Sequence, residues 1–126
     1  MHYIMMIKAT MDYEAGKPPS PELMAGMARL TEEYVKSGAM VATGGLAPSS
    51  QGMRVRLENG RRSVTDGPFI ETKELIGGYA ILKAGSREEA IAMANRVLDV
   101  HAAAHVRETE IEIRPLHHVM HFGDGR

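Results

Sequence analysis

The sequence predicts an α+β protein of the ferredoxin-like class, with the element order β-α-β, an inserted β-hairpin, and a second β-α-β unit. Two segments with apolar residues at helical spacing each begin at a serine placed as a helix cap. Short apolar segments flank both helices, and an Asn-Gly pair stands between two alternating segments in the middle of the chain. Together these features predict a four-stranded sheet, two helices and one hairpin.

The first half of the chain supplies a strand, a helix and a second strand. Residues 2–9 (HYIMMIKA) are predicted as the first strand. In the following helix, Ser20 is the expected N-cap, Pro21 takes the first helical position, and Gly38 lies just past the end. The apolar stripe of this helix consists of Leu23, Met27, Leu30 and Tyr34. Residues 39–48 (AMVATGGLAP) are predicted as the second strand, closed by a Gly/Pro loop.

The second half repeats this order. Residues 75–84 (LIGGYAILKA) are predicted as a strand. The helix over 86–101 begins with a capping box formed by Ser86 and Glu89. Residues 108–116 (ETEIEIRPL) are predicted as the last strand.

The strand patterns separate central strands from edge strands. The first strand is apolar on both faces, with Tyr3, Met5 and Ile7 on one side and Ile4 and Met6 on the other. The last strand instead alternates isoleucines with charged residues, as an edge strand does. Two helices cover only one face of a four-stranded sheet, so the apolar residues of the other face need a cover. We expect that cover to be a second copy of the chain, giving a homodimer.

The hairpin over residues 53–65 has a predictable register. With Asn59 and Gly60 as the two turn residues, pairing counts outward from the turn. The expected pairs are Glu58 with Arg61, Val55 with Val64, and Met53 with Asp66. Asp66 then lies at the end of an otherwise apolar hairpin face.

Two interpretations of Asp66 are open. In the structural one, Gly67 and Pro68 bend the chain and the Asp66 side chain accepts a backbone N–H, with Phe69 as the nearest donor. In the functional one, Asp66 is a general acid or base at the edge of a cleft. Both can hold at once.

Composition limits the class of protein. The 126 residues fit one domain, which we place at 1–116, followed by a tail at 117–126. The formal net charge of −1 gives no field that favours nucleic acid or an anionic membrane. The chain has no cysteine, which excludes disulfides, thiolate catalysis and zinc–thiolate sites. The apolar opening is only one strand long, so neither a signal peptide nor a membrane span is expected. We expect a soluble, cytoplasmic protein.

The stretch VTDGPFIETKELIGGYAIL (64–82) resembles the signature of the DGPF-type branch of the YCII-related family. The resemblance extends to the opening strand, the acidic first helix, the GGLAP loop and the closing EIRPL. It implies a ferredoxin-like dimer of the α+β barrel kind and small-molecule enzymology through a cleft acid and base pair. It also implies gene neighbours that encode extracytoplasmic-function sigma factors. The histidine and aspartate pair proposed for the wider family has no clean counterpart, because no histidine lies between His2 and His101.

The signature also supplies the remaining candidate residues. Asp66, Lys73 and Glu74 are the candidate catalytic residues: Asp66 as proton acceptor or donor, Lys73 as holder of an anionic substrate, and a glutamate as a second proton carrier. The candidate substrate-binding residues are Gly67, Pro68, Phe69, Glu71, Tyr79 and Arg54.

Non-functional interpretations of these residues are also open. The ETKE run is equally typical of a solvated, salt-bridged loop, and the arginines on the polar hairpin face are typical of solubility.

No tightly bound cofactor or specific metal site is expected. The chain lacks a phosphate-binding Gly-rich loop, a nucleophile elbow and a Rossmann fingerprint. His101 and His105 stand four residues apart but straddle the predicted helix end.

The function predicted from the signature residues is small-molecule enzymology or ligand binding, by proton transfer or elimination, near the signature. The alternative is a non-catalytic regulatory or interaction module, linked to a sigma-factor system.

Overall fold

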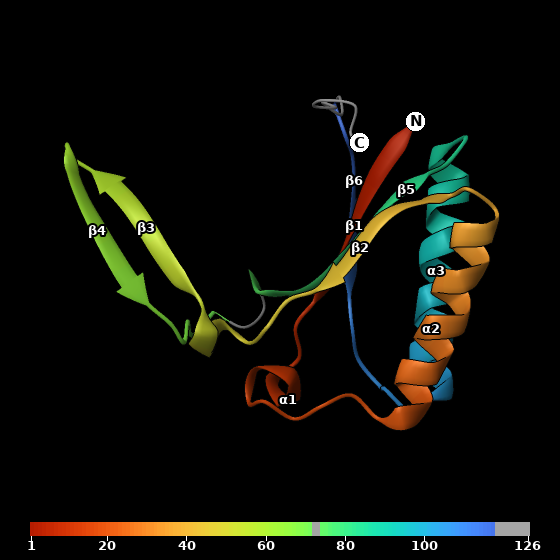
Figure 1. Cartoon of the computed structure of the whole chain (residues 1–126), viewed down its shortest axis with the longest axis horizontal. Coiled ribbons are helices and arrows are strands. Elements are labelled where there is room, and N and C mark those ends of the chain that lie inside the picture. The colour runs from red at the N-terminus through yellow and green to blue at the C-terminus, as the bar shows by residue number, and fades with distance from the viewer. Residues whose placement is uncertain (72–73, 118–126) are drawn as a thin grey trace.

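The computed structural model describes residues 1–71 and 74–117 and places one sheet between a pair of helices and a projecting hairpin (Figure 1). The elements in chain order are β1 (His2–Lys8), α1 (Met11–Glu14), α2 (Pro21–Lys36), β2 (Met40–Gly45), the 3₁₀ helix η1 (Ser49–Gln51), β3 (Met53–Glu58), β4 (Arg61–Asp66), β5 (Ile76–Lys83), α3 (Arg87–Ala103) and β6 (Ile111–Pro115).

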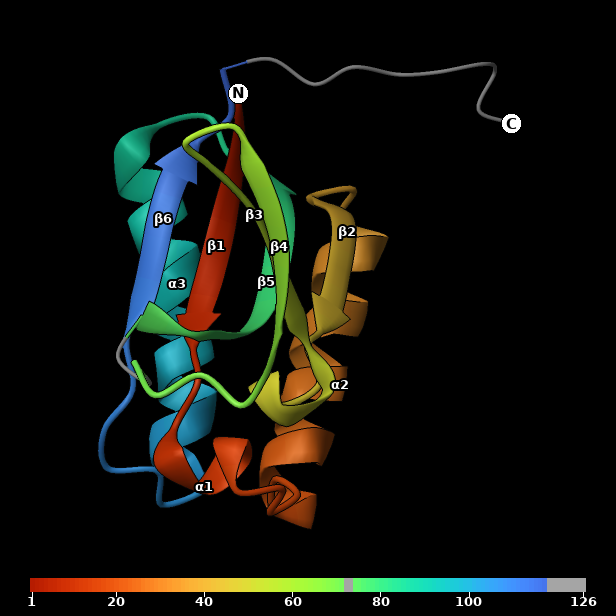
Figure 2. The same cartoon turned by 90° about the vertical axis from the view of Figure 1, so that its left-hand side faces the viewer.

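The main sheet is antiparallel and has the strand order β2-β5-β1-β6. The two strands predicted to be central, β1 and β5, are central, and β2 and β6 form the edges. Both long helices, α2 and α3, cover the same face of this sheet (Figures 1 and 2). The predicted ferredoxin-like α+β fold is therefore confirmed.

The predicted helix caps form as well. The Ser20 hydroxyl accepts a hydrogen bond from the backbone N–H of Leu23 at 3.1 Å, and Pro21 begins α2. Gly38 follows α2 with φ of 81°, a left-handed conformation that glycine adopts without steric cost. Ser86 caps α3 in the same way by accepting from the N–H of Glu89.

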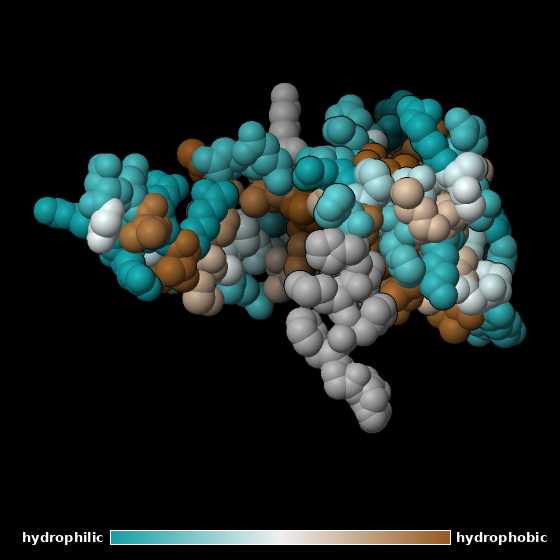
Figure 3. Space-filling view, turned by 90° about the horizontal axis from the view of Figure 1, so that it is seen from above, coloured by the Kyte–Doolittle hydropathy of each residue, from teal (hydrophilic) through white to brown (hydrophobic). Residues whose placement is uncertain are grey.

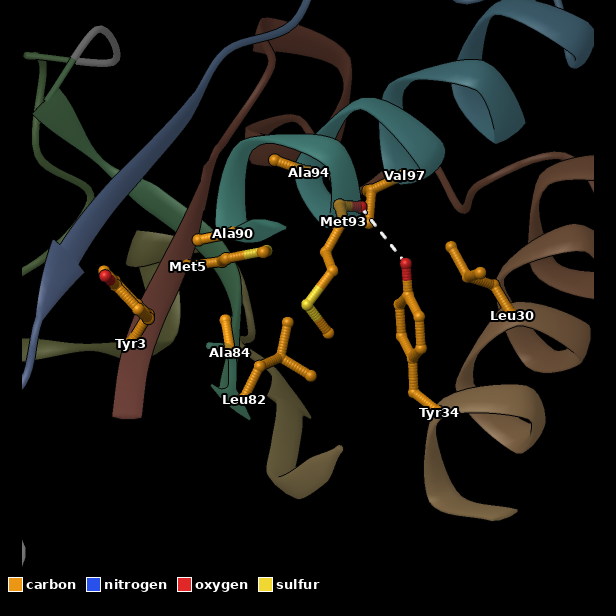
Figure 4. Close-up of a cluster of buried hydrophobic side chains, with 10 residues drawn as sticks. All are labelled: Tyr3, Met5, Leu30, Tyr34, Leu82, Ala84, Ala90, Met93, Ala94 and Val97. Atoms are coloured by element: carbon orange, nitrogen blue, oxygen red, sulfur yellow. Dashed lines mark hydrogen bonds between the residues drawn. The ribbon is translucent and has the colours of Figure 1, made fainter. Parts of the chain in front are cut away.

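The core lies between the sheet and the two helices (Figure 4). Met5 of β1 and Leu82 of β5 are its least exposed large side chains. Tyr34 of α2 packs beside them and donates its hydroxyl hydrogen bond to the main-chain carbonyl of Met93 in α3, at 3.4 Å. This polar contact lets a tyrosine hydroxyl enter an apolar core without an unpaired donor.

An ion pair joins the two helices outside the core. Arg96 of α3 donates two hydrogen bonds to the carboxylate of Glu33 in α2. The Arg96 guanidinium lowers the pKa of Glu33 through these bonds, and the carboxylate raises the pKa of Arg96. The guanidinium carbon Cζ of Arg96 also lies 5.5 Å from the centroid of the Tyr34 ring.

The sheet face opposite the helices carries apolar side chains that no helix covers. Met6 lies beside Tyr79, and Ile4 beside Ile81, across the β1–β5 pair. All four are half-buried. This is the face for which a second copy of the chain is expected, and the homodimer stays a prediction.

The β3–β4 hairpin has the predicted register, from Glu58 opposite Arg61 to Met53 opposite Asp66. Asn59 and Gly60 both have positive φ, at 51° and 76°, as an Asn-Gly hairpin turn requires. The hairpin stands away from the sheet, on the side opposite the helices (Figure 1), and every residue in its two strands is exposed.

One face of the exposed hairpin is largely apolar, with Arg62 opposite Leu57 and Asp66 opposite Met53 as its charged residues. The apolar side chains there, with their exposed fractions, are Met53 (61%), Val55 (73%), Leu57 (68%) and Val64 (65%). Hydrophobic residues are visible at the hairpin surface, at the left of Figure 3. A lone two-stranded hairpin is marginally stable in water, so this face is suited to a covering partner.

Two short elements were not predicted. Helix α1 begins after Thr10, whose hydroxyl accepts a hydrogen bond from the N–H of Tyr13. It is only four residues long, too short to show a helical period. The 3₁₀ helix η1 has no side-chain cap at all.

Helix α3 continues two residues past its predicted end, to Ala103. None of the helices in the described ranges is long and apolar enough to cross a membrane.

Candidate functional site

The signature turn is packed directly against η1. Asp66 ends β4, and the peptide bond between Gly67 and Pro68 is cis. The backbone N–H of Gly67 donates to the carbonyl of Gly52 at 2.9 Å. A Cβ atom on Gly67 would lie 1.7 Å from the carbonyl oxygen of Ser49. Only glycine fits at this position, which explains the Gly of the signature in steric terms.

Ser49 connects the signature to two other segments. Its hydroxyl accepts a hydrogen bond from the N–H of Phe69 at 2.9 Å and donates to one carboxylate oxygen of Glu14. Its own N–H donates to the other Glu14 oxygen at 2.9 Å. The carboxylate at the end of α1 thus fixes the serine, and the serine fixes the signature turn.

These bonds correct the structural interpretation of Asp66. In that interpretation Phe69 was the nearest N–H donor for the Asp66 side chain, but the Phe69 N–H binds Ser49 instead. Sequence proximity favoured Asp66 as the acceptor for the Phe69 N–H. The close packing of η1 against the turn instead places the Ser49 hydroxyl within hydrogen-bond distance of that N–H. Within the described ranges, the Asp66 side chain has no hydrogen bond or ion pair, and the residue is exposed. Its carboxylate is therefore not used to hold the turn.

Three predicted site residues contact one another beside this turn. The guanidinium carbon of Arg54 lies 3.8 Å from the centroid of the Phe69 ring, a cation–π contact. A guanidinium nitrogen of Arg54 also lies 3.5 Å from a carboxylate oxygen of Glu71. The start of β3 and the signature loop are joined through this arginine.

The other predicted site residues are placed separately. Glu74 is exposed, and its N–H donates to the carbonyl of Glu71 at 2.9 Å. Tyr79 belongs to β5, where its ring covers Gly44: a Cβ atom there would lie 2.9 Å from ring carbon Cε1. Lys73 lies outside the described residues. The structure thus brings Arg54, Phe69 and Glu71 together with the Gly67-Pro68 turn.

Glu14 and Ser49 are site residues that sequence reasoning missed. The sequence signals at Glu14 are Thr10, a helix-capping residue type, and the acidic side chains that follow it. Nothing in the sequence pairs Glu14 with Ser49, because they are 35 residues apart and both belong to short, irregular segments.

The structure also has a cavity of about 780 Å³ that sequence reasoning did not predict. It lies between the helices and the sheet, and of the predicted site residues that the structure describes, only Tyr79 lines it. The described part of the chain contains no group of three or more His, Asp or Glu side chains able to hold a metal ion.

Comparison with known proteins places the chain in a family. The YCII-related domain family matches residues 1–113. An uncharacterized protein of Rhizobium meliloti (strain 1021) is 27% identical over 100 residues, which are 79% of this chain and 77% of that protein. Since the family match covers nearly the whole chain, the chain belongs to the YCII-related family.

Proposed function

We propose that the chain is a homodimeric small-molecule enzyme or ligand-binding protein of the DGPF-type branch. Its chemistry is proton transfer or elimination at the signature, without a tightly bound cofactor. The ligand site is completed when the second copy that covers the free face of the main sheet also covers the apolar hairpin face.

One observation carries this proposal: the exposed apolar face of the hairpin ends in a carboxylate that has no hydrogen bond or ion pair with any residue in the described ranges. Val55 and Val64 form a directly opposed apolar pair on this face, and Asp66 is the next residue of β4 on the same side. Removing an apolar face from water is favourable, and a carboxylate at its edge then becomes less solvated. Asp66 would face a ligand as an acceptor that the fold does not already use.

The contacts around the turn support the proposed roles. The contacts with Ser49 and Gly52 hold Gly67 and Phe69 in place. The backbone directly after Asp66 is therefore fixed. Phe69 supplies an apolar wall, with Arg54 stacked on it and paired to Glu71. The roles of Lys73 as anion holder and of Glu74 as second proton carrier belong to this proposal, as does Tyr79 as a binding residue.

A ligand screen by thermal shift tests the proposal. Wild type and Asp66→Asn are compared against small carboxylates, lactones, phosphates and aromatic acids, because a ligand that binds the native state alone raises the melting temperature. Asp99→Asn, an exposed position on α3, is the matched control. We expect a ligand that stabilises wild type and Asp99→Asn but not Asp66→Asn. Equal stabilisation of all three proteins would remove Asp66 from the site.

A second function is favoured by the same hairpin. A non-catalytic interaction module, linked to a sigma-factor system, would use the exposed apolar face to bind a different protein. Ile70, 88% exposed beside the turn, would extend that surface. This function predicts a monomeric chain and indifference to Asp66→Asn, whereas the first predicts a dimer.

A further inference from the structure

The cavity between the sheet and the helices is separate from the Gly67-Pro68 turn of the signature, although Gly77, Gly78 and Tyr79 from the strand that ends the signature line it. Its lining excludes Arg54 and residues 66–71, and it reaches the core at Met5, Leu30 and Leu82 (Figure 4). Helix α1 lies at the lower end of the sheet, near the start of α2 and the end of α3 (Figures 1 and 2). A volume of about 780 Å³ is in the range of small-molecule sites.

The lining inside the cavity is apolar and adaptable. Four methionines contribute to it, from strands β1 and β2 and helix α2: Met5, Met24, Met27 and Met40. Methionine side chains are flexible and polarizable, so they adjust to ligands of different shape. The body of a ligand in this cavity is therefore apolar.

Three hydroxyl groups of the lining are already used, whereas those of Thr31, Tyr79 and Thr109 form no hydrogen bond within the described ranges. Tyr13, Tyr34 and Thr43 each donate a hydrogen bond to a main-chain carbonyl, of Leu46, Met93 and Tyr79 respectively. A polar ligand body beside these three groups would have to break their bonds or leave its own groups unpaired, and both are costly. This part of the interior therefore selects against polar ligand bodies.

The charged lining residues include one cation without an ion pair. Lys17 lies 3.5 Å from Asp12. Lys8 lies 3.3 Å from Glu112, which is not part of the lining. Arg107, which is exposed, forms no ion pair with any residue in the described ranges, although its neighbour Glu108 also lines the cavity. A guanidinium at the rim is suited to bind a carboxylate through two hydrogen bonds.

His101 adds a second polar group to the lining. Its Nδ1 lies 2.8 Å from the carbonyl oxygen of Val97, and because a carbonyl only accepts, Nδ1 carries a proton. Its Nε2 is the nitrogen left for a ligand. It can donate to a carboxylate when the ring is charged, or accept from a carboxylic acid when the ring is neutral.

We infer that this cavity binds an amphipathic carboxylate, with its apolar chain among the four methionines and its carboxylate at Arg107 and His101. The inference stands on the cavity alone and does not depend on Asp66, on the Gly67-Pro68 turn or on a second copy of the chain.

Methionine methyl NMR with decanoate tests the location. In protein labelled with ¹³C at the methionine methyl groups, we expect saturable shift changes at Met5, Met24, Met27 and Met40. Met6, on the opposite face of β1, and Met53, on the hairpin, are internal controls. Saturable changes at Met6 or Met53 without changes at the four cavity methyls would overturn the inference, and so would the absence of any saturable change.

Decanol and an arginine variant test the head group. Decanol has the same chain without the charge, and Arg107→Gln removes the guanidinium. Arg114→Gln, in β6 and outside the lining, is the matched control. We expect decanoate to bind Arg107→Gln about tenfold more weakly than it binds wild type and Arg114→Gln. Decanol is expected to bind all three alike. Equal decanoate affinity in all three proteins would overturn the carboxylate assignment.

Discussion

The carbonyl oxygen of Ser49 occupies the space where a Cβ atom of residue 67 would stand, at 1.7 Å, so that the signature and η1 meet backbone to backbone. The same serine binds Phe69 on one side and Glu14 on the other. The conformation of the signature therefore depends on two earlier segments of the chain, one around Ser49 and one around Glu14.

Gly67→Ala should destabilise the protein, because neither backbone segment can move without breaking hydrogen bonds. We expect a loss of about 2–4 kcal/mol in the free energy of unfolding, measured by urea denaturation. Gly52→Ala is the control: a Cβ atom there would lie 3.4 Å from the same carbonyl oxygen, a distance that a small shift accommodates. Equal effects of the two substitutions would contradict the close approach at Gly67.

Ser49→Ala should free the signature turn from α1. It removes the acceptor for the Phe69 N–H and one partner of the Glu14 carboxylate, so we expect a loss of about 1–3 kcal/mol in unfolding free energy. Amide hydrogen exchange at Phe69 should also become faster. Ser50→Ala, at an exposed neighbouring position, should change neither quantity. Unchanged exchange at Phe69 in Ser49→Ala would show that this bond does not hold the turn.

The fold followed from local patterns in the sequence. Strand alternation predicted which strands are central, and Asn59-Gly60 predicted the hairpin register to the residue, because turn geometry fixes pairing. Capping residues such as Ser20 predicted helix starts, because a cap bond joins residues only three apart.

The site was less accessible to prediction. The cluster of Arg54, Phe69 and Glu71 forms from residues that were singled out, yet its support by Glu14 and Ser49 was missed. That support joins two short segments without periodicity, and such long-range contacts leave no local pattern. The cavity was missed for a related reason, since methionines at helical spacing look the same whether they fill a core or line a cavity.

The Glu33–Arg96 pair should make stability depend on pH. Because Arg96 lowers the pKa of Glu33 in the folded protein, the stabilisation is present above the pKa of the unfolded carboxyl and is lost as pH falls through the folded value. Wild type should therefore exceed Arg96→Gln in stability at pH 7, and the difference should shrink by pH 3. Arg87→Gln, which removes an exposed charge from the same helix, should show a much smaller pH-dependent difference when both are followed by urea denaturation.

A charge placed on the apolar hairpin face should abolish self-association. Val64→Glu introduces a carboxylate opposite Val55, where burial against a second copy would leave the charge desolvated and unpaired. Ser63→Glu introduces the same charge on the other face of the hairpin, at an equally exposed position. We expect the first substitution to raise the dissociation constant at least about a hundredfold and the second to change it little.

Sedimentation equilibrium of the wild-type chain and these two variants, at micromolar concentration, tests the proposed function most directly. The account predicts twice the mass of one chain for wild type and Ser63→Glu, and the mass of one chain for Val64→Glu. A wild-type protein with the mass of a single chain, or a Val64→Glu variant that remains a dimer, would contradict the proposal that a second copy covers the hairpin and completes the site at Asp66.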